Sequence, residues 1–86
     1  MEFSSYKLME KGDGYDIVLY LDECSVKFSP DLLNSKNKER QSIIKQGRNY
    51  LKKVLPNVRI NNLTIMHGSF VIYQIAFSGT VIKPLF

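Results

Sequence analysis

The sequence predicts a small α+β domain of the ββαββ type, in which one amphipathic helix packs on one face of a mainly antiparallel sheet. Two pairs of short apolar runs, each pair interrupted by a glycine-containing reversal, predict the strands. A single long segment with helical periodicity lies between the pairs and predicts the helix. The chain has 86 residues, of which 44% are hydrophobic and 23% are charged. These values are typical of one globular domain, residues 1–86, with one compact core.

The first hairpin is predicted around the reversal at residues 11–14, Lys-Gly-Asp-Gly. Apolar-rich runs flank it at residues 6–9 and 15–21, and glycine supplies the positive φ values that a tight turn needs. In the second run, side chains at every second position are apolar, as expected for a strand with one buried face. These residues are Tyr15, Ile17, Leu19 and Leu21.

Residues 22–35 are predicted to form a connecting loop, because the apolar periodicity is lost there. Ser29-Pro30-Asp31 indicates a turn or the start of a short helix, and Val26 and Phe28 are the expected apolar anchors. An irregular connection of this length is uncommon in so small a domain. A short extra strand at residues 25–28 is therefore a second interpretation.

The helix is predicted over residues 36–55, with Asn34 or Ser35 as its N-cap and Pro56 after its end. Gly47 lies at the centre of the apolar stripe, where glycine costs about 1 kcal/mol relative to alanine. We expect a close approach of the helix to the sheet to compensate for this cost. The stripe, at the helical period, consists of Ile43, Ile44, Tyr50, Leu51, Val54 and Leu55.

The C-terminal hairpin is predicted over residues 58–78, with its turn at residues 67–69. No charged residue occurs between Arg59 and Lys83, and the second arm is almost continuously apolar. Residues 60–82 are also long enough to cross a membrane as a helix, and basic residues precede them. Membrane association with the N-terminus inside is therefore an alternative prediction, although the polar and β-branched residues in this stretch favour the hairpin.

An apolar sheet face with open edges is expected to be covered by another copy of the chain, by oligomerisation or by strand addition. The C-terminal hairpin supplies this surface because its second arm is apolar on both sides. The predicted self-association surface consists of Phe70, Val71, Tyr73, Ile75 and Phe77.

The charges are divided unevenly along the chain. Residues 1–31 carry three lysines against seven acidic residues, whereas residues 36–59 carry eight basic residues against Glu39 alone. This distribution predicts a basic helix face opposite the apolar stripe. The face is either a solvated surface or a site for an acidic protein, nucleic acid or an anionic membrane. No helix-turn-helix or RNA-recognition signature accompanies it. The predicted face consists of Lys38, Lys45, Arg48, Lys52 and Lys53.

The sequence contains no constellation typical of catalysis, so we predict that the protein is not an enzyme and has no cofactor and no metal site. Cys24 is the only cysteine and His67 the only histidine, which excludes an internal disulfide and the ordinary zinc motifs. His67, beside Gly68 and Ser69, is interpreted as a turn residue. The N-terminal residues lack a basic region followed by an apolar run, so a cytoplasmic location is expected.

Three segments carry a family resemblance, and they lie at residues 11–22, 50–60 and 65–70. They read Lys-Gly-Asp-Gly-Tyr-Asp-Ile-Val-Leu-Tyr-Leu-Asp, Tyr-Leu-Lys-Lys-Val-Leu-Pro-Asn-Val-Arg-Ile and Ile-Met-His-Gly-Ser-Phe. In this order they resemble short N-terminal segments that precede a hydrophobic export segment in some Gram-positive cell-wall-associated proteins. The resemblance covers about the first three quarters of the chain. It implies a following cleavage site and a wall-binding or hydrolytic domain, and it assigns no functional residue here.

These observations favour a non-enzymatic binding or self-assembly module, such as a bacterial or phage-like assembly or adaptor protein. In this hypothesis the protein is a homo-oligomer that associates through the C-terminal hairpin and offers the basic helix face to an acidic partner. One alternative is a membrane-associated protein that uses residues 60–82. The other is a nucleic-acid-binding regulator that uses the basic helix.

Overall fold

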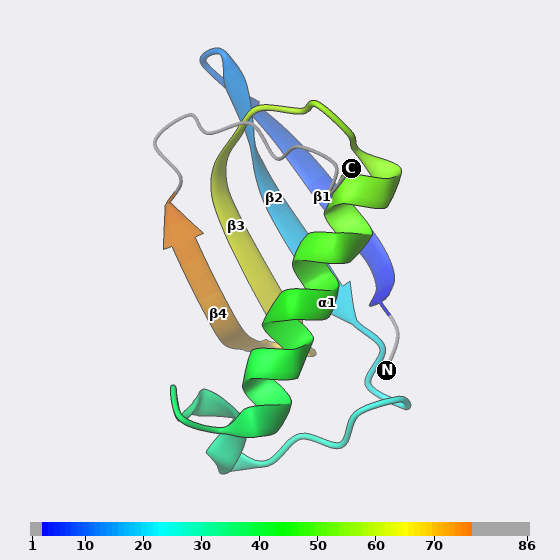
Figure 1. The fold of residues 1–86 in the computed structure, drawn as a ribbon, viewed down its shortest axis with the longest axis vertical. Coiled ribbons are helices and arrows are strands. Elements are labelled where there is room, and N and C mark those ends of the chain that lie inside the picture. Colours follow the sequence, from blue (N-terminus) through cyan, green and yellow to red (C-terminus); the bar gives the residue numbers. More distant parts are fainter. Residues whose placement is uncertain (1–2, 77–86) are drawn as a thin grey trace.

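The computed structural model describes residues 3–76 and consists of one four-stranded sheet with a single α-helix against it (Figure 1). The predicted α+β fold of the ββαββ type is therefore confirmed. In chain order the elements are β1 (Phe3–Lys11), β2 (Gly14–Leu21), the 3-10 helix η1 (Pro30–Leu33), α1 (Lys38–Val54), β3 (Ile60–His67) and β4 (Phe70–Ala76).

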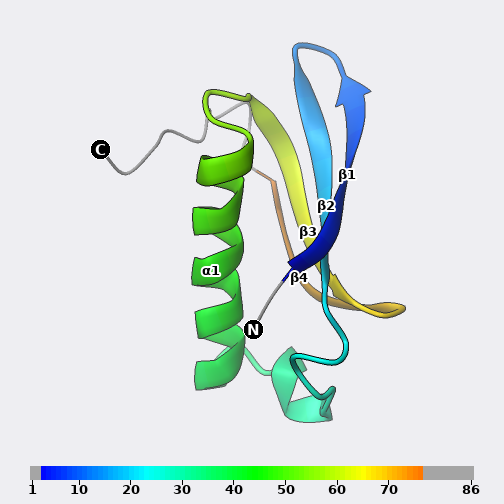
Figure 2. The ribbon, with the colours of Figure 1, turned by 90° about the vertical axis from the view of Figure 1, so that its right-hand side faces the viewer.

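The strands lie side by side in the order of the sequence, β1-β2-β3-β4. Both outer pairs are antiparallel hairpins, whereas the central pair, β2 and β3, is parallel. A parallel pair needs a long crossover connection, and α1 supplies it. Figure 2 shows the consequence: α1 lies on one side of the sheet, and no described element lies on the other side.

Both hairpins turn through two residues that begin with glycine. Gly12 and Gly68 have φ values of 62° and 60°, and the residue after each of them is not in the left-handed region. A positive φ at the first central position only is the pattern of a type II′ turn, whose twist matches that of the flanking strands. The two reversals predicted from the sequence are therefore present.

The helix starts two residues later than predicted. Asn37 is its N-cap, and the Asn37 side chain accepts a hydrogen bond from the backbone N–H of Arg40 at 2.9 Å. The prediction of Asn34 or Ser35 as the cap is wrong because Asn34 instead closes η1, with its N–H bonded to the Asp31 carbonyl. The end of the helix agrees with the expectation from Pro56, since Val54 is the last helical residue.

The connection between β2 and α1 contains η1 but no extra strand at residues 25–28. Its first part is a turn in which the N–H groups of Ser25 and Val26 bond to the Asp22 carbonyl, so these groups are not available to a strand. Val26 is buried and Phe28 packs on the core, as expected for anchors. Pro30 occupies the first turn of η1, where its missing N–H is tolerated.

The core lies between α1 and the sheet. From the helix it takes Ile43 and Leu51, which are both fully buried, with Gly47 between them. A Cβ at residue 47 would lie 3.0 Å from Ile65 Cδ1 and 3.3 Å from Leu19 Cδ1. The predicted close approach of the helix to the sheet at Gly47 is therefore present. The sheet and the loop contribute Ile17, Leu19, Leu21, Val26, Leu32, Ile60, Leu63, Ile65 and Ile72.

The apolar stretch at residues 60–82 is not a helix in its described part. Residues 60–67 and 70–76 form β3 and β4 and pair with each other, and residues 77–82 lie outside the described residues. Within residues 3–76, no helix combines the length and apolar character that a membrane span requires.

Candidate functional site

Most of the predicted basic face lies on the outer side of α1. Lys38, Lys45 and Lys53 are exposed, and Lys52 is half-buried. A spacing of seven residues is close to two helical turns, so Lys38, Lys45 and Lys52 form one row about 21 Å long. We call Lys38, Lys45, Lys52 and Lys53 the basic ridge.

Arg48 differs from the other predicted basic residues because its side chain reaches β4. Its Nη2 donates a hydrogen bond to Tyr73 Oη at 3.0 Å. Arg40 reaches the same ring from the first turn of the helix, with its guanidinium carbon 5.5 Å from the ring centroid. Arg40 Nε also donates to the Ile72 carbonyl at 3.1 Å. We call Arg40, Arg48 and Tyr73 the arginine cluster.

The sequence prediction omitted Arg40 from the candidate residues, although a signal for it was present. Arg40 precedes Ile43 by three residues and Gly47 by seven, which places it on the apolar stripe rather than on the outer face. A cation in that position needs a partner, because burying an unpaired charge is costly. The Tyr73 ring and the Ile72 carbonyl together provide one.

The phenol of Tyr73 gives a direct test of this cluster. Tyr73→Phe is expected to lower the free energy of unfolding by about 1 kcal/mol, because the hydrogen bond to Arg48 is lost while the ring stays under Arg40. Tyr73→Leu, which also removes the ring, is expected to lower it by about 2 kcal/mol. Urea denaturation followed by circular dichroism measures both, and equal losses would show that the ring is not a partner of Arg40.

The predicted self-association surface is divided between two faces of the sheet. Phe70 is 51% exposed and stacks on Phe28, with 4.3 Å between the ring centroids. Tyr73 and Ile75 pack partly against the core on the helix side. Val71, 46% exposed, points away from the helix, and Phe77 lies outside the described residues.

A β-bulge causes this division. Met66 pairs with Val71, but Ile65 pairs with Tyr73, so Ile72 is an extra residue on β4. Side chains of a regular strand alternate, and one extra residue transfers every later side chain to the other face. Tyr73 and Ile75 therefore join Phe70 on the helix side instead of joining Val71.

The sheet face away from α1 carries a contiguous group of apolar side chains. Tyr20 pairs with Met66, and Met66 pairs with Val71, while Val18 occupies the same face of β2. Val18, Tyr20 and Met66 are half-buried by their neighbours. We call Val18, Tyr20, Met66 and Val71 the open sheet face, because no element within residues 3–76 covers them.

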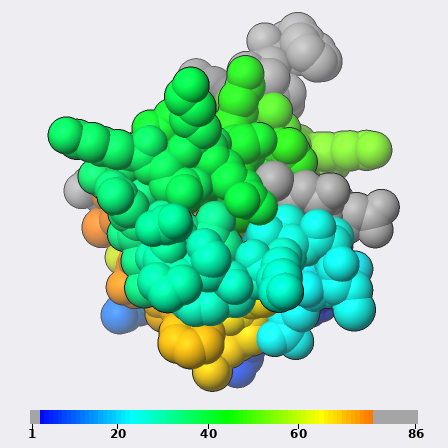
Figure 3. Space-filling view, turned by 90° about the horizontal axis from the view of Figure 1, so that it is seen from below, coloured from blue at the N-terminus to red at the C-terminus, as the bar shows by residue number. Residues whose placement is uncertain are grey.

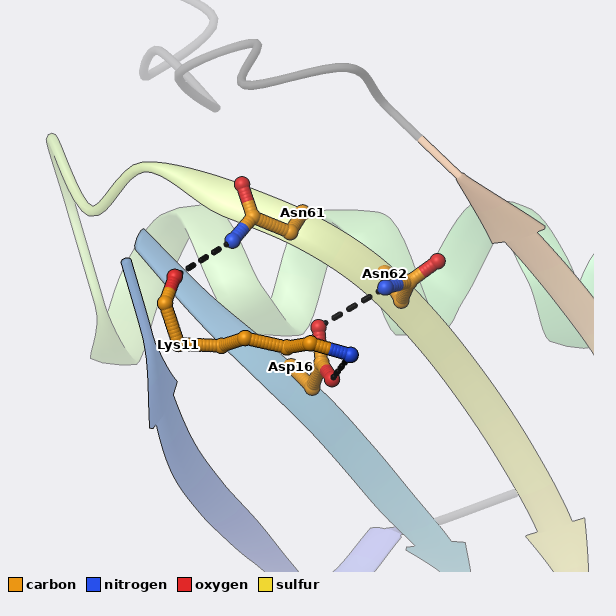
Figure 4. A network of polar contacts seen from close by, with 4 residues as sticks. All are labelled: Lys11, Asp16, Asn61 and Asn62. Atoms are coloured by element: carbon orange, nitrogen blue, oxygen red, sulfur yellow. Dashed lines mark hydrogen bonds and ion pairs between the residues drawn. The ribbon is translucent and has the colours of Figure 1, made fainter. Parts of the chain in front are cut away.

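A polar network borders the open sheet face at the end near the first turn (Figure 4). Asn61 Nδ2 donates to the Lys11 carbonyl, and Asn62 Nδ2 donates to Asp16 Oδ1, both at 2.8 Å. Lys11 Nζ lies 3.8 Å from the other Asp16 oxygen. The two asparagine contacts fasten the first hairpin to β3, and the ion pair joins its two strands.

A surface hollow of about 490 Å³ opens beside this network. Arg59 and Asp13 line the hollow. The distance from Arg59 Nη1 to Asp13 Oδ2 is 4.0 Å. Lys11, Asn61 and Asn62 of the network also line it.

His67 is a structural residue rather than an exposed turn residue. It ends β3, is 5% exposed, and its Nε2 donates a hydrogen bond to the Val26 carbonyl. Its ring lies 5.7 Å from that of Phe28. The interaction fixes the loop after β2 against the core. Cys24 is exposed, and the described part of the chain contains no group of three His, Cys, Asp or Glu residues that could hold a metal ion.

Among the surfaces of residues 3–76, the basic ridge and the open sheet face are covered by no described element. No protein-family model, curated protein or solved structure matches this chain.

Proposed function

We propose that the protein is a non-enzymatic binding module that self-associates through its open sheet face. The observation that carries this proposal is the continuous row of Tyr20, Met66 and Val71 across three strands, on a face that no described element covers. A sheet with one helical layer buries only one of its faces, and an apolar second face is stabilised by a partner. A second copy offers the same surface and makes a symmetric contact.

The edge of β4 supports the same arrangement. This strand carries no charged residue and no proline in residues 70–76, the composition that favours pairing of strand edges. The bulge at Ile72 and the bond from Arg40 occupy part of the edge. The open sheet face is therefore the principal contact in this proposal, and the edge of β4 extends it.

Light scattering of the protein without detergent tests the proposal. The measured mass of the wild-type protein is expected to exceed 9.9 kDa, the mass of one chain, and to increase with protein concentration. Val71→Lys places a charge within the contact, on its β4 side, and is expected to return the mass to that of the monomer.

Leu33→Lys is the matched control, because Leu33 is 50% exposed on η1, away from the open sheet face. It is expected to leave the mass unchanged. A wild-type protein that stays monomeric at millimolar concentration would contradict the proposal, as would equal effects of the two substitutions.

A further inference from the structure

The four lysines of the basic ridge have no ionic partner among residues 3–76. The ion pairs within residues 3–76 join Lys11 to Asp16 and Arg59 to Asp13, and neither includes a lysine of α1. Glu39 is the only acidic residue of the helix. Close like charges repel one another, and a polyanion that neutralises them gains free energy from released counterions. The ridge therefore fits a partner with a high density of negative charge.

The shape of the ridge is convex. Around the helix axis, successive residues are rotated by about 100°. Lys45 and Lys52 therefore lie within about 40° of Lys38 in one direction, and Lys53 lies about 60° from Lys38 in the other. Glu39 falls outside this arc. In Figure 3, long side chains of the helical segment extend away from the body of the molecule in several directions. A flat surface contacts only the crest of such a ridge, whereas a groove contacts both of its sides.

The other side chains of the arc are hydrogen-bonding groups without charge. They belong to Ser42 and Asn49, with Gln41 about 20° beyond the edge of the arc, and no apolar residue lies among them. Such residues contact the phosphates and base edges of nucleic acids. A helix that binds to lipid usually inserts apolar side chains below the headgroups, and this face has none to insert.

The geometry points to duplex DNA as the partner, with α1 lying in the major groove and the basic ridge contacting phosphates. A helix with its side chains is about 10 to 12 Å wide, and the major groove of B-DNA is about 12 Å wide. The major groove of duplex RNA is too narrow for this. The inference does not depend on self-association, because the basic ridge and the open sheet face lie on opposite sides of the sheet.

Three or four phosphate contacts give weak binding that depends strongly on salt. The logarithm of the binding constant should fall with that of the salt concentration with a slope of about −2.7 to −3.6, as expected from about −0.9 for each phosphate. Raising the salt from 50 to 200 mM should then weaken binding by roughly 40- to 150-fold. Specific base contacts are not needed for this result.

Fluorescence anisotropy with a labelled 20-base-pair DNA duplex tests the inference in 50 mM salt. Replacement of Lys38, Lys45 and Lys52 by glutamine is expected to weaken binding at least tenfold and to reduce the salt slope by about 3. The control replaces Lys7, Lys11 and Lys27, which are also exposed, by glutamine and changes the net charge equally. It is expected to weaken binding less than threefold.

Equal losses in the two triple variants would overturn the inference, because net charge alone would then explain the binding. A second assay uses vesicles of phosphatidylcholine with 30% phosphatidylserine. Binding to these vesicles without binding to the duplex would assign the ridge to a membrane surface and would also overturn the inference. Unchanged urea midpoints for both variants establish that each is folded.

Discussion

Leu19→Ala is expected to lower the free energy of unfolding by about 2 to 5 kcal/mol, which is the largest effect we expect from a single truncation. Leu19 is fully buried on the helix side of β2, and Ile65 of β3 pairs with it in the register of the sheet. Its Cδ1 is among the atoms nearest to Gly47 on the helix. Removal of the side chain leaves a cavity between all three elements, and the surrounding residues fill it only partly.

Urea denaturation at 25 °C followed by circular dichroism measures this loss. A domain of this size has a stability on the order of 5 to 10 kcal/mol, so the variant should lose a large fraction of it. Leu33→Ala makes the same chemical change at a side chain that is 50% exposed, and its effect should stay within about 0.5 kcal/mol. A loss below 1 kcal/mol at Leu19 would contradict the packing described for the core.

Much of the fold could be predicted from local patterns in the sequence. The alternation from Tyr15 to Leu21 identifies a strand with one buried face, and the glycines at 12 and 68 identify two hairpin turns. Gly47 in the apolar stripe identifies where the helix contacts the sheet. These signals are local because each arises from the conformation or the burial of a few neighbouring residues.

The parallel pairing of β2 with β3 could not be read in the same way. Both strands have an apolar face whichever neighbour they pair with, so their composition does not determine strand order. The order depends on how α1 crosses from the end of β2 to the start of β3 and covers one face. That choice is a property of the whole chain rather than of a single segment.

The candidate surfaces were predicted less accurately than the fold. The alternation rule assigns Val71, Tyr73 and Ile75 to one face, but the extra residue Ile72 separates them. A bulge depends on the partner strand and on the bond from Arg40 to the Ile72 carbonyl, which a strand pattern does not contain. The bulge also places Tyr73 on the helix side, where its hydroxyl accepts the hydrogen bond from Arg48.

Gly47→Val is expected to lower the free energy of unfolding by about 2 to 3 kcal/mol, because the helix must move away from the sheet to admit the side chain. Even the Cβ of the new residue would lie 3.0 Å from Ile65 Cδ1 and 3.2 Å from Phe3 Cζ. Asn49→Val is the control on the same helix, at an exposed position, and it should cost less than about 1 kcal/mol. Urea denaturation again provides the measurement.

A double-mutant cycle identifies the contact that is responsible. Ile65→Val removes only Cδ1, the atom closest to the new Cβ, and alone should cost about 1 kcal/mol. The double variant Gly47→Ala with Ile65→Val should lose at least about 0.5 kcal/mol less unfolding free energy than the sum of the two single losses. The reason is that Ile65→Val removes the atom with which the new Cβ at residue 47 would collide. Alanine also gains about 1 kcal/mol of helix propensity over glycine, which is constant in both backgrounds and cancels in the cycle. Additive effects would show that Ile65 does not limit the approach of α1 to the sheet, and that the glycine is required by another contact.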